Sequence, residues 1–361
     1  MSVFDRSLSI DDVAREAGVS RQTISNVLNH PHRVRPETRT LVEAVISRLG
    51  YRANAAARGL RTLKSSLIGV RIDPTQFRSS IQNDYLWHLS QAAENRGLGI
   101  IPFTASSKQD ELAKIKRLVE SDRVDGFALT QTLAEDPRVE YLSRRGVPFV
   151  TFGRPWSSPN SYSSKHPWVD VDGKFGTSVA TQTLLNCGFT NIGFLTTNAV
   201  KRGKSASVDK DRYEGWRVAM SENGMTDSMI SDSVIIAPGE DVSDAKRSVV
   251  ELLANSPAPQ AIVCFSDALA LGAQLALEES GKTAEIVGFD NSPIAEEFGF
   301  SSIDQRLEHV AEQSVSILMG SSGPVIKLRD FAAEGLAAHC LVSPVLVPRG
   351  KLAQLLDSRK V

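Results

Sequence analysis

The sequence predicts two kinds of structure in one chain: an all-α N-terminal headpiece built on a helix-turn-helix, and a two-lobed α/β domain. Two observations carry this prediction. Residues 9–28 place apolar side chains at helical spacing on both sides of a glycine, whereas from residue 67 onward short apolar strands alternate with amphipathic helices. Such an alternation is typical of parallel sheets that helices cover on both faces.

The headpiece begins with two short helices joined by a tight turn. The first helix has its apolar stripe at Ile10, Val13, Ala14 and Ala17. Ser9 is placed to cap it, with Asp12 as an acidic partner in a capping box. Gly18 ends the helix because a left-handed residue is needed there, and Ser20 caps a second helix over residues 21–28. Two helices joined in this way form a helix-turn-helix, whose second helix enters the major groove of DNA.

The second helix carries amide, guanidinium and hydroxyl groups on the side that we expect to be exposed. Such groups read base edges or bind phosphates, whereas a merely solvated face is richer in Glu and Lys. We expect DNA contacts from Ser20, Arg21, Gln22, Thr23, Ser25, Asn26 and Asn29, and phosphate contacts from Arg33 and Arg35 in the next loop. The alternative is an ordinary helical hairpin on a protein surface.

A third helix completes the predicted headpiece. Pro36 suits a first helical position, and Glu37 suits the positive end of the helix dipole. Its apolar stripe is Leu41, Val42, Val45, Ile46 and Leu49, and Gly50 closes it. We expect this stripe to bury the apolar sides of the first two helices.

The runs VAREAGVSRQTISNVLN and RVRPETRTLVEAVISRLGYRANAAARGLR resemble the DNA-binding headpiece of the lactose-repressor (LacI/GalR) family across residues 9–61. Two positions depart from it, since the family often has Arg at Asn26 and usually has Pro at Ala53. The resemblance implies a headpiece over residues 1–52 and a hinge helix with linker over residues 53–66. It adds Tyr51, Asn54, Ala57 and Leu60 to the DNA contacts, with Leu60 wedged into a minor-groove base step. From the residues alone, a frayed linker is the alternative, because so short a helix with Gly59 is marginal in water.

The remaining chain, residues 67–361, is expected to form an effector-binding and dimerisation domain. Its predicted strands cover residues 67–72, 99–104, 126–130, 148–153, 191–196, 233–238, 261–266 and 285–290. The two series of strands indicate two doubly wound lobes, with crossovers near 168–172 and 301–305. We expect one lobe from about 67–167 and 306–325, and the other from about 168–305 and 326–361. This resembles the type I periplasmic-binding-protein architecture of the same family's sensor domain.

Ligands of such sheets bind outside the carboxyl ends of the strands. The candidate ligand contacts at these ends are Asp73, Gln82, Asn83, Arg154, Asp172, Phe265, Ser266, Asp267 and Asp290. The family resemblance adds Arg212, four residues before Trp216. Carboxylates, amides and an Arg suit sugar hydroxyls, and Trp156 or Phe289 could cover an apolar sugar face. Helix capping is the alternative for several of these residues, including Ser266 and Asp267.

Composition narrows the class of protein. The net charge is −1, yet residues 1–64 hold eleven basic against six acidic residues, so the head is basic and the body acidic. The sequence contains neither an apolar run long enough to span a membrane nor a signal-peptide pattern. Three scattered cysteines indicate reduced thiols in a cytoplasmic protein, and the six histidines lack zinc spacing. No nucleophile motif is present. We therefore predict no cofactor, no metal site and no catalysis.

Together these observations predict a transcriptional regulator that binds a palindromic operator as a homodimer and responds to a small effector, a sugar or nucleoside. It would repress carbohydrate or nucleoside catabolic genes, with the helix near Tyr85–Ala93 contributing the dimer surface. Two alternatives stay open at this point. The effector could act as a co-repressor, or the chain could be a metabolite-binding protein or sugar-processing enzyme with a non-functional helical head.

Overall fold

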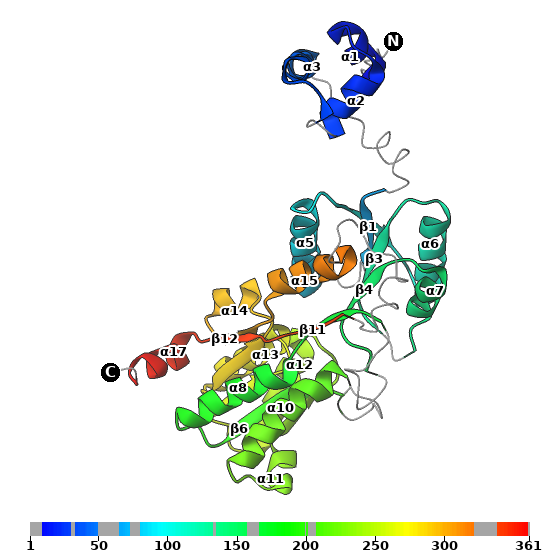
Figure 1. Ribbon diagram of the computed structural model, residues 1–361. Helices are drawn as coiled ribbons and strands as arrows, with labels where there is room; N and C mark the ends of the chain where they lie inside the picture. Colours follow the sequence, from blue (N-terminus) through cyan, green and yellow to red (C-terminus); the bar gives the residue numbers. More distant parts are fainter. Residues whose placement is uncertain are drawn as a thin grey trace, which may run out of the picture. The chain divides into compact units, whose positions relative to one another are not determined.

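The computed structural model describes residues 9–29, 33–49, 65–72, 80–132, 135–156, 166–198, 200, 207–320 and 338–359. The chain divides into two compact units, Met1–Ser65 and Ser66–Val361. This division lies within one residue of the predicted end of the linker. Figure 1 shows the helical first unit in blue and the α/β second unit in the remaining colours.

The first unit contains the three predicted helices, α1 (Ile10–Ala17), α2 (Arg21–Asn29) and α3 (Pro36–Leu49). The capping box is present, since the Ser9 hydroxyl accepts from the Asp12 amide and the Asp12 carboxylate accepts from the Ser9 amide. Gly18 is left-handed, with φ 62°. The Ser20 hydroxyl accepts from the Thr23 amide at 3.1 Å, so Ser20 caps α2 as expected.

The core of the first unit consists of Val13, Ala14, Ala17, Ile24, Val27, Val42 and Val45. Leu41 was expected in the apolar stripe of the third helix but is 50% exposed, and Leu28, near the end of α2, is 37% exposed. The inward positions of α2 and α3 are taken by the β-branched residues Ile24, Val27, Val42 and Val45. The two leucines are therefore left on the surface.

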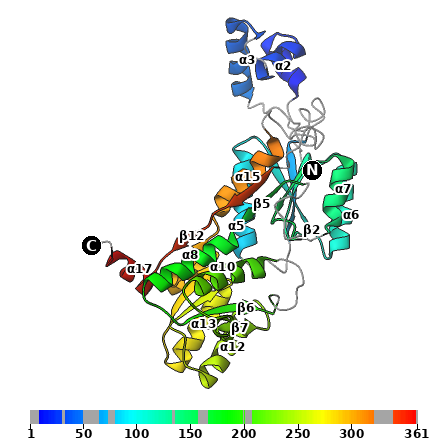
Figure 2. The ribbon, with the colours of Figure 1, turned by 60° about the horizontal axis from the view of Figure 1, so that its bottom comes forward.

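The first lobe of the second unit is a six-stranded sheet in the order β11-β5-β4-β3-β1-β2. Its strands, all parallel, are β1 (Leu67–Ile72), β2 (Gly99–Thr104), β3 (Gly126–Leu129), β4 (Phe149–Phe152), β5 (Trp168–Val171) and β11 (His339–Val342). Helices α5 (Ser80–Glu94) and α15 (Leu307–Met319) lie on one face, and α6 (Lys108–Glu120) and α7 (Pro137–Arg145) on the other (Figures 1 and 2).

The second lobe has the sheet order β12-β10-β9-β8-β6-β7. Its strands are β6 (Ile192–Thr197), β7 (Val234–Ala237), β8 (Ala261–Cys264), β9 (Glu285–Phe289), β10 (Ser301–Asp304) and the antiparallel β12 (Val345–Val347). Its helices are α8 (Gly173–Asn186), α10 (Val208–Glu222), α11 (Asp227–Asp232), α12 (Val242–Asn255), α13 (Asp267–Ser280), α14 (Pro293–Phe298) and α17 (Gly350–Asp357). In Figure 1, α8 and α10 lie side by side, and so do α12 and α13.

The predicted lobe boundaries are wrong at two places. Residues 168–172 were assigned to the second lobe, but β5 pairs with β4 through Thr151 and Trp168 and so belongs to the first. Residues from 326 onward were also assigned there, but β11 pairs with β5. Four-residue apolar strands look alike in sequence, and only their pairing decides which sheet they join. The chain crosses between the lobes after β5, after β10 and again between β11 and β12.

The expected dimer surface on the helix near Tyr85–Ala93 stays a prediction, and the structure limits it to one side of the helix. Tyr85, Leu89, Ala92 and Ala93 of α5 are buried, and the Tyr85 hydroxyl donates to Ser314 of α15 at 3.2 Å. This side of α5 therefore packs inside its own lobe. Trp87, on the other hand, is 64% exposed.

Candidate functional site

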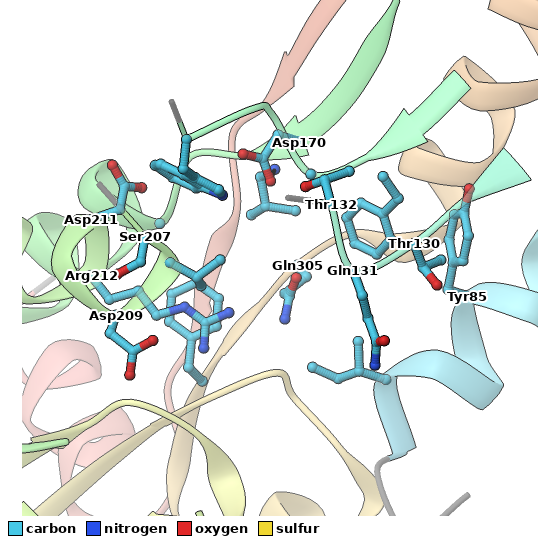
Figure 3. A pocket seen from close by; sticks show the side chains of 18 of the residues that line it. Tyr85, Thr130, Gln131, Thr132, Asp170, Ser207, Asp209, Asp211, Arg212 and Gln305 are labelled. Carbon is cyan, nitrogen blue, oxygen red and sulfur yellow. Dashed lines mark hydrogen bonds between the residues drawn. The ribbon is translucent and has the colours of Figure 1, made fainter. Parts of the chain in front are cut away.

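A cavity of about 400 Å³ lies between the two lobes of the second unit, a size typical of small-molecule pockets. Its lining is Ile81, Gln82, Tyr85, Thr130, Gln131, Thr132, Phe152, Gly153, Trp156, Asp170, Val171, Gly173, Ser207, Val208, Asp209, Asp211, Arg212, Phe289 and Gln305 (Figure 3). Many of these residues end or follow strands β3, β4, β5, β9 and β10. The cavity therefore lies at the carboxyl ends of the strands, where ligands of parallel sheets are expected to bind.

Figure 3 shows how the two lobes contribute to this cavity. Ser207, Asp209 and Arg212, at the start of α10, come from the second lobe. Thr130, Gln131 and Thr132, which follow β3, stand across from them in the first lobe, with Gln305 between the two groups. A molecule in the cavity would thus contact both lobes.

Arg154, just after β4, forms a buried ion cluster behind the cavity wall. Its guanidinium lies 2.8 Å from the carboxylate of Asp170 in β5 and 2.8 Å from that of Asp211 in α10. Only 1% of Arg154 is exposed, and its guanidinium stacks 4.3 Å from the centre of the Trp156 ring. Burial raises the pKa of Asp170 to about 6, although the charge of Arg154 opposes this. Because Asp211 lies in the other lobe, the cluster joins the two lobes.

Arg212 is the cation that faces the cavity directly from the second lobe. Its guanidinium carbon lies 3.6 Å from the ring centre of Phe289 and 4.7 Å from that of Phe265. It donates to the Phe265 carbonyl and lies 3.8 Å from the Asp290 carboxylate. Burial raises the pKa of Asp290 to about 8, with Arg212 opposing the rise. The aromatic rings and the carbonyl hold Arg212 in place, so it can donate to an oxygen-rich ligand without reorganising.

Five of the predicted ligand residues lie at the cavity or next to it. Gln82 and Arg212 line the cavity. Arg154, Phe265 and Asp290 lie next to lining residues and contact them, as the preceding distances show.

The remaining predicted ligand residues are not among the described residues that line the cavity. Asp172 and Ser266 accept from backbone amides as caps of α8 and α13. Asp267 is buried and accepts hydrogen bonds from Ser292 and Ser302. Asn83 lies in α5 but is not among the lining residues, and Asp73 lies outside the described residues. For Ser266 the capping alternative describes the observed geometry.

Several lining residues were missed from the sequence. Thr130 ends the predicted strand over residues 126–130, and Gln131 and Thr132 follow it, so the expectation that ligands bind at strand ends already pointed to them. Asp170 shows a different signal, because a carboxylate inside a four-residue buried strand needs a partner, which is Arg154. Asp209 and Asp211 precede Arg212 within DKDR, and Asp209 accepts from the Thr197 hydroxyl at 2.9 Å. Gln305, which follows β10, donates to Asp290 at 2.7 Å.

Several of the residues predicted to contact DNA are exposed in the first unit. Arg21 and Gln22 are exposed on α2, and Arg33 and Arg35 are exposed before α3. The Gln22 amide nitrogen donates to the Asn26 side-chain oxygen at 3.1 Å, which aligns these two amides along one side of the helix.

Ser25 was expected on this exposed side, but it is only 5% exposed. It is adjacent to Ile24 on a two-turn helix, half of which faces the core, and its small side chain fits there. Tyr51, Asn54, Ala57 and Leu60 lie outside the described residues, as does the predicted hinge helix.

In the described part of the chain, no helix combines the length and the apolar character that crossing a bilayer requires. Nor do histidines, cysteines and carboxylates there gather into a group that could hold a metal ion.

Comparison with known proteins matches both units to one family. The model for bacterial regulatory proteins of the lacI family matches residues 9–54. The model for periplasmic binding proteins and the sugar-binding domain of the LacI family matches residues 79–329. The HTH-type transcriptional regulator RafR of Escherichia coli is 31% identical over 79% of this chain and 82% of its own length.

Two solved structures share the fold. The transcriptional regulator CelR in complex with cellobiose has a TM-score of 0.64 at 24% identity and covers 95% of this chain and 99% of that one. The lac repressor dimer bound to operator and the anti-inducer ONPF has a TM-score of 0.73 at 21% identity and covers 95% and 98%. With a helix-turn-helix unit, a cavity between two lobes and family matches to both, the chain belongs to the LacI family of ligand-responsive, DNA-binding transcriptional regulators.

Proposed function

We propose that this chain is a homodimeric repressor that a small sugar-like effector, bound between the lobes, releases from a palindromic operator. The observation that carries the effector class is the lining of the cavity. Side chains that donate and accept hydrogen bonds alternate there with the aromatic rings of Tyr85, Trp156 and Phe289. A sugar matches this lining, because its hydroxyl groups can pair with such donors and acceptors and its apolar face can lie on an aromatic ring. The related CelR, solved with cellobiose, supports a carbohydrate.

The charges of the cavity favour an uncharged effector. Among the described residues, the carboxylates of Asp170, Asp209 and Asp211 line it, and Arg212 is the cation that lines it. Arg154 lies behind the wall and is already bound to two of these carboxylates. From the described residues, a phosphorylated sugar would therefore meet net negative charge at short range, which costs several kcal/mol in a poorly solvated site. A neutral sugar or nucleoside avoids this cost.

Regulation follows from a ligand that contacts both lobes. The effector stabilises one relative position of the lobes, and DNA stabilises the position that suits the paired headpieces. Effector and operator then change each other's affinity by the same factor. We propose that Gln22 and Asn26 read bases in the major groove, whereas Arg33 and Arg35 contact phosphates. Each subunit reads one half-site, and the exposed side of α5, including Trp87, contributes to the dimer.

The protein would act by binding and not by catalysis, in the cytoplasm where the DNA is. The experiment that tests this selects genomic fragments on the purified full-length protein and then measures affinity for the enriched site. A panel of pentoses, hexoses, cyclitols, nucleosides and disaccharides, cellobiose among them, is added to the binding reaction. We expect an enriched palindrome whose affinity one compound lowers. A compound that raises the affinity would make the protein a co-repressor-dependent regulator, and a ligand without any enriched fragment would contradict the operator proposal.

A further inference from the structure

The lining residue Gln131 has an unusual backbone. It follows β3 with φ 53°, a left-handed conformation that non-glycine residues seldom adopt and that costs free energy. Such strain persists only where the surroundings hold it, and it is concentrated at ligand sites. Figure 3 shows the Gln131 side chain entering the cavity on the side opposite Arg212.

Three cations hold Gln131 by its two carbonyl oxygens. The main-chain oxygen accepts from Lys108 at 3.2 Å and from Arg138 at 3.1 Å. The side-chain oxygen accepts from Arg71 at 3.0 Å and from Lys108 at 3.5 Å. These charge-assisted bonds are stronger than bonds between neutral groups and offset the backbone strain.

The three cations are fixed in turn by two buried carboxylates. Glu111 is 0% exposed and pairs with Arg71 at 3.2 Å, with Lys108 at 3.8 Å and with Arg138. Asp136 pairs with Arg138 at 2.6 Å. This five-residue ion cluster, which we call the Gln131 clamp, connects β1, α6 and α7 behind the cavity wall. It therefore presents Gln131 from a rigid base.

The clamp also decides which way the amide of Gln131 points. The oxygen must face the cations, because the amide nitrogen would meet three positive donors there. Among the described residues no acceptor is paired with the nitrogen, Nε2, which is left at the cavity. We infer that Gln131 is a specificity-determining residue of the effector site, which presents a fixed N–H donor and selects ligands with an oxygen acceptor at that point. This inference rests on the proposed function, since it takes the cavity as the effector site.

The orientation can be tested without any ligand. In ¹⁵N-labelled full-length protein, the side-chain amide signal of Gln131 is the one that disappears in Gln131→Glu. Arg71→Met removes one cation from its oxygen, so we expect this signal to shift. Arg247→Met is the matched control, because the Arg247 side chain is 66% exposed and its ion pair is with Asp244 on the same helix. An unmoved signal in Arg71→Met would overturn the inferred orientation.

The selectivity is tested with the compound of the panel that binds most tightly, together with derivatives in which single hydroxyls are replaced by fluorine or hydrogen. Fluorine can accept weakly but cannot donate. At one hydroxyl position of the ligand, we expect replacement by fluorine to change the Kd of the wild-type protein by less than about 3-fold. Replacement of the same hydroxyl by hydrogen should weaken binding by roughly 3- to 10-fold. Gln131→Glu keeps the shape and the cations but can only accept. At the same position it should bind the fluoro derivative at least about 10-fold more weakly than the parent.

Gln274→Glu is the matched substitution on α13, where Gln274 bonds to Glu278 and Phe298 outside the cavity. We expect it to bind every derivative as the wild type does. If Gln131→Glu also did so, the inferred role would be overturned while the proposed function stood. A panel without any binder would overturn both the effector proposal and the selectivity, and the amide signal would still decide the orientation.

Discussion

Replacing Arg154 with methionine perturbs the ion cluster that joins the two lobes. Methionine preserves most of the side-chain volume but leaves the carboxylates of Asp170 and Asp211, each 2.8 Å away, without their shared cation. Arg154 and Asp170 are 1% and 6% exposed, so solvent replaces little of the lost interaction. Breaking a buried ion pair from one side costs about 3–5 kcal/mol. We expect the free energy of unfolding to fall by about this amount at pH 7.5.

The cost should depend on pH, and its sign follows from Asp170. Burial raises the pKa of Asp170 in the folded protein from 3.8 to about 6, so the folded state binds more protons than the unfolded state. Stability therefore falls as the pH rises from about 4 through 6. Without Arg154 the folded pKa rises further, and the fall continues to higher pH. At pH 5, where Asp170 is mostly neutral in both proteins, the loss should be less than half of that at pH 7.5.

Urea unfolding followed by tryptophan fluorescence measures this effect, because Trp168 and Trp216 are buried in the first and second lobes. Arg144→Met is the matched control, since Arg144 is 77% exposed and its i,i+4 pair with Glu140 should contribute at most about 0.5 kcal/mol. Adding Asp170→Asn to Arg154→Met removes the unpaired carboxylate and should recover stability at pH 7.5. Equal losses at both pH values, or no recovery in the double variant, would refute the reasoning.

Three further predictions concern the effector, the DNA and the helix packing. Arg212→Ala should leave operator affinity unchanged in gel-shift titrations but weaken the effector response at least about 10-fold, because a charged hydrogen-bond donor is lost; loss of DNA binding would show that Arg212 has another role. Gln22→Ala should relax base preference, whereas Arg35→Ala should weaken all sequences about equally and lower the salt slope by about 1; binding-site selection at several salt concentrations would separate these, and uniform losses for both variants would contradict the assignment. Gly215→Ala would place a methyl carbon 2.1 Å from the Lys174 carbonyl oxygen where α10 meets α8, and should cost about 1–3 kcal/mol or more in urea unfolding; wild-type stability would mean that these helices separate easily.

The local structure of the first unit could be predicted because its signals lie within a few residues. The Ser9–Asp12 capping box and the left-handed Gly18 need no distant partner, and both were predicted. Ser25 was placed wrongly because its burial depends on which side of α2 meets the other helices. In a helix of nine residues, a small shift of that side moves a neighbour of Ile24 from the surface to the interior.

The cavity could be located from sequence, but its contacts could not. Parallel strands direct their carboxyl ends to one edge, so Gln82 and Arg212 were found by position or resemblance. Which carboxylate meets which cation depends on sheet pairing and on the approach of two lobes. Asp170 and Asp211 are distant in sequence from Arg154 and lie in different lobes, and no local pattern links them. The wrong assignment of β5 to the second lobe made this cluster impossible to foresee.

The Arg154 cluster also limits what an effector can do. Because Arg154 and Asp170 belong to the first lobe and Asp211 to the second, the lobes are already joined by an ion pair that needs no ligand. A ligand shifts an equilibrium only by the difference between its affinities for the two states. An effector that merely kept this ion pair would change nothing. Its effect must come from contacts present in one lobe position alone. Arg212 and Gln131, which face the cavity from opposite sides, are two of the lining residues able to make such contacts.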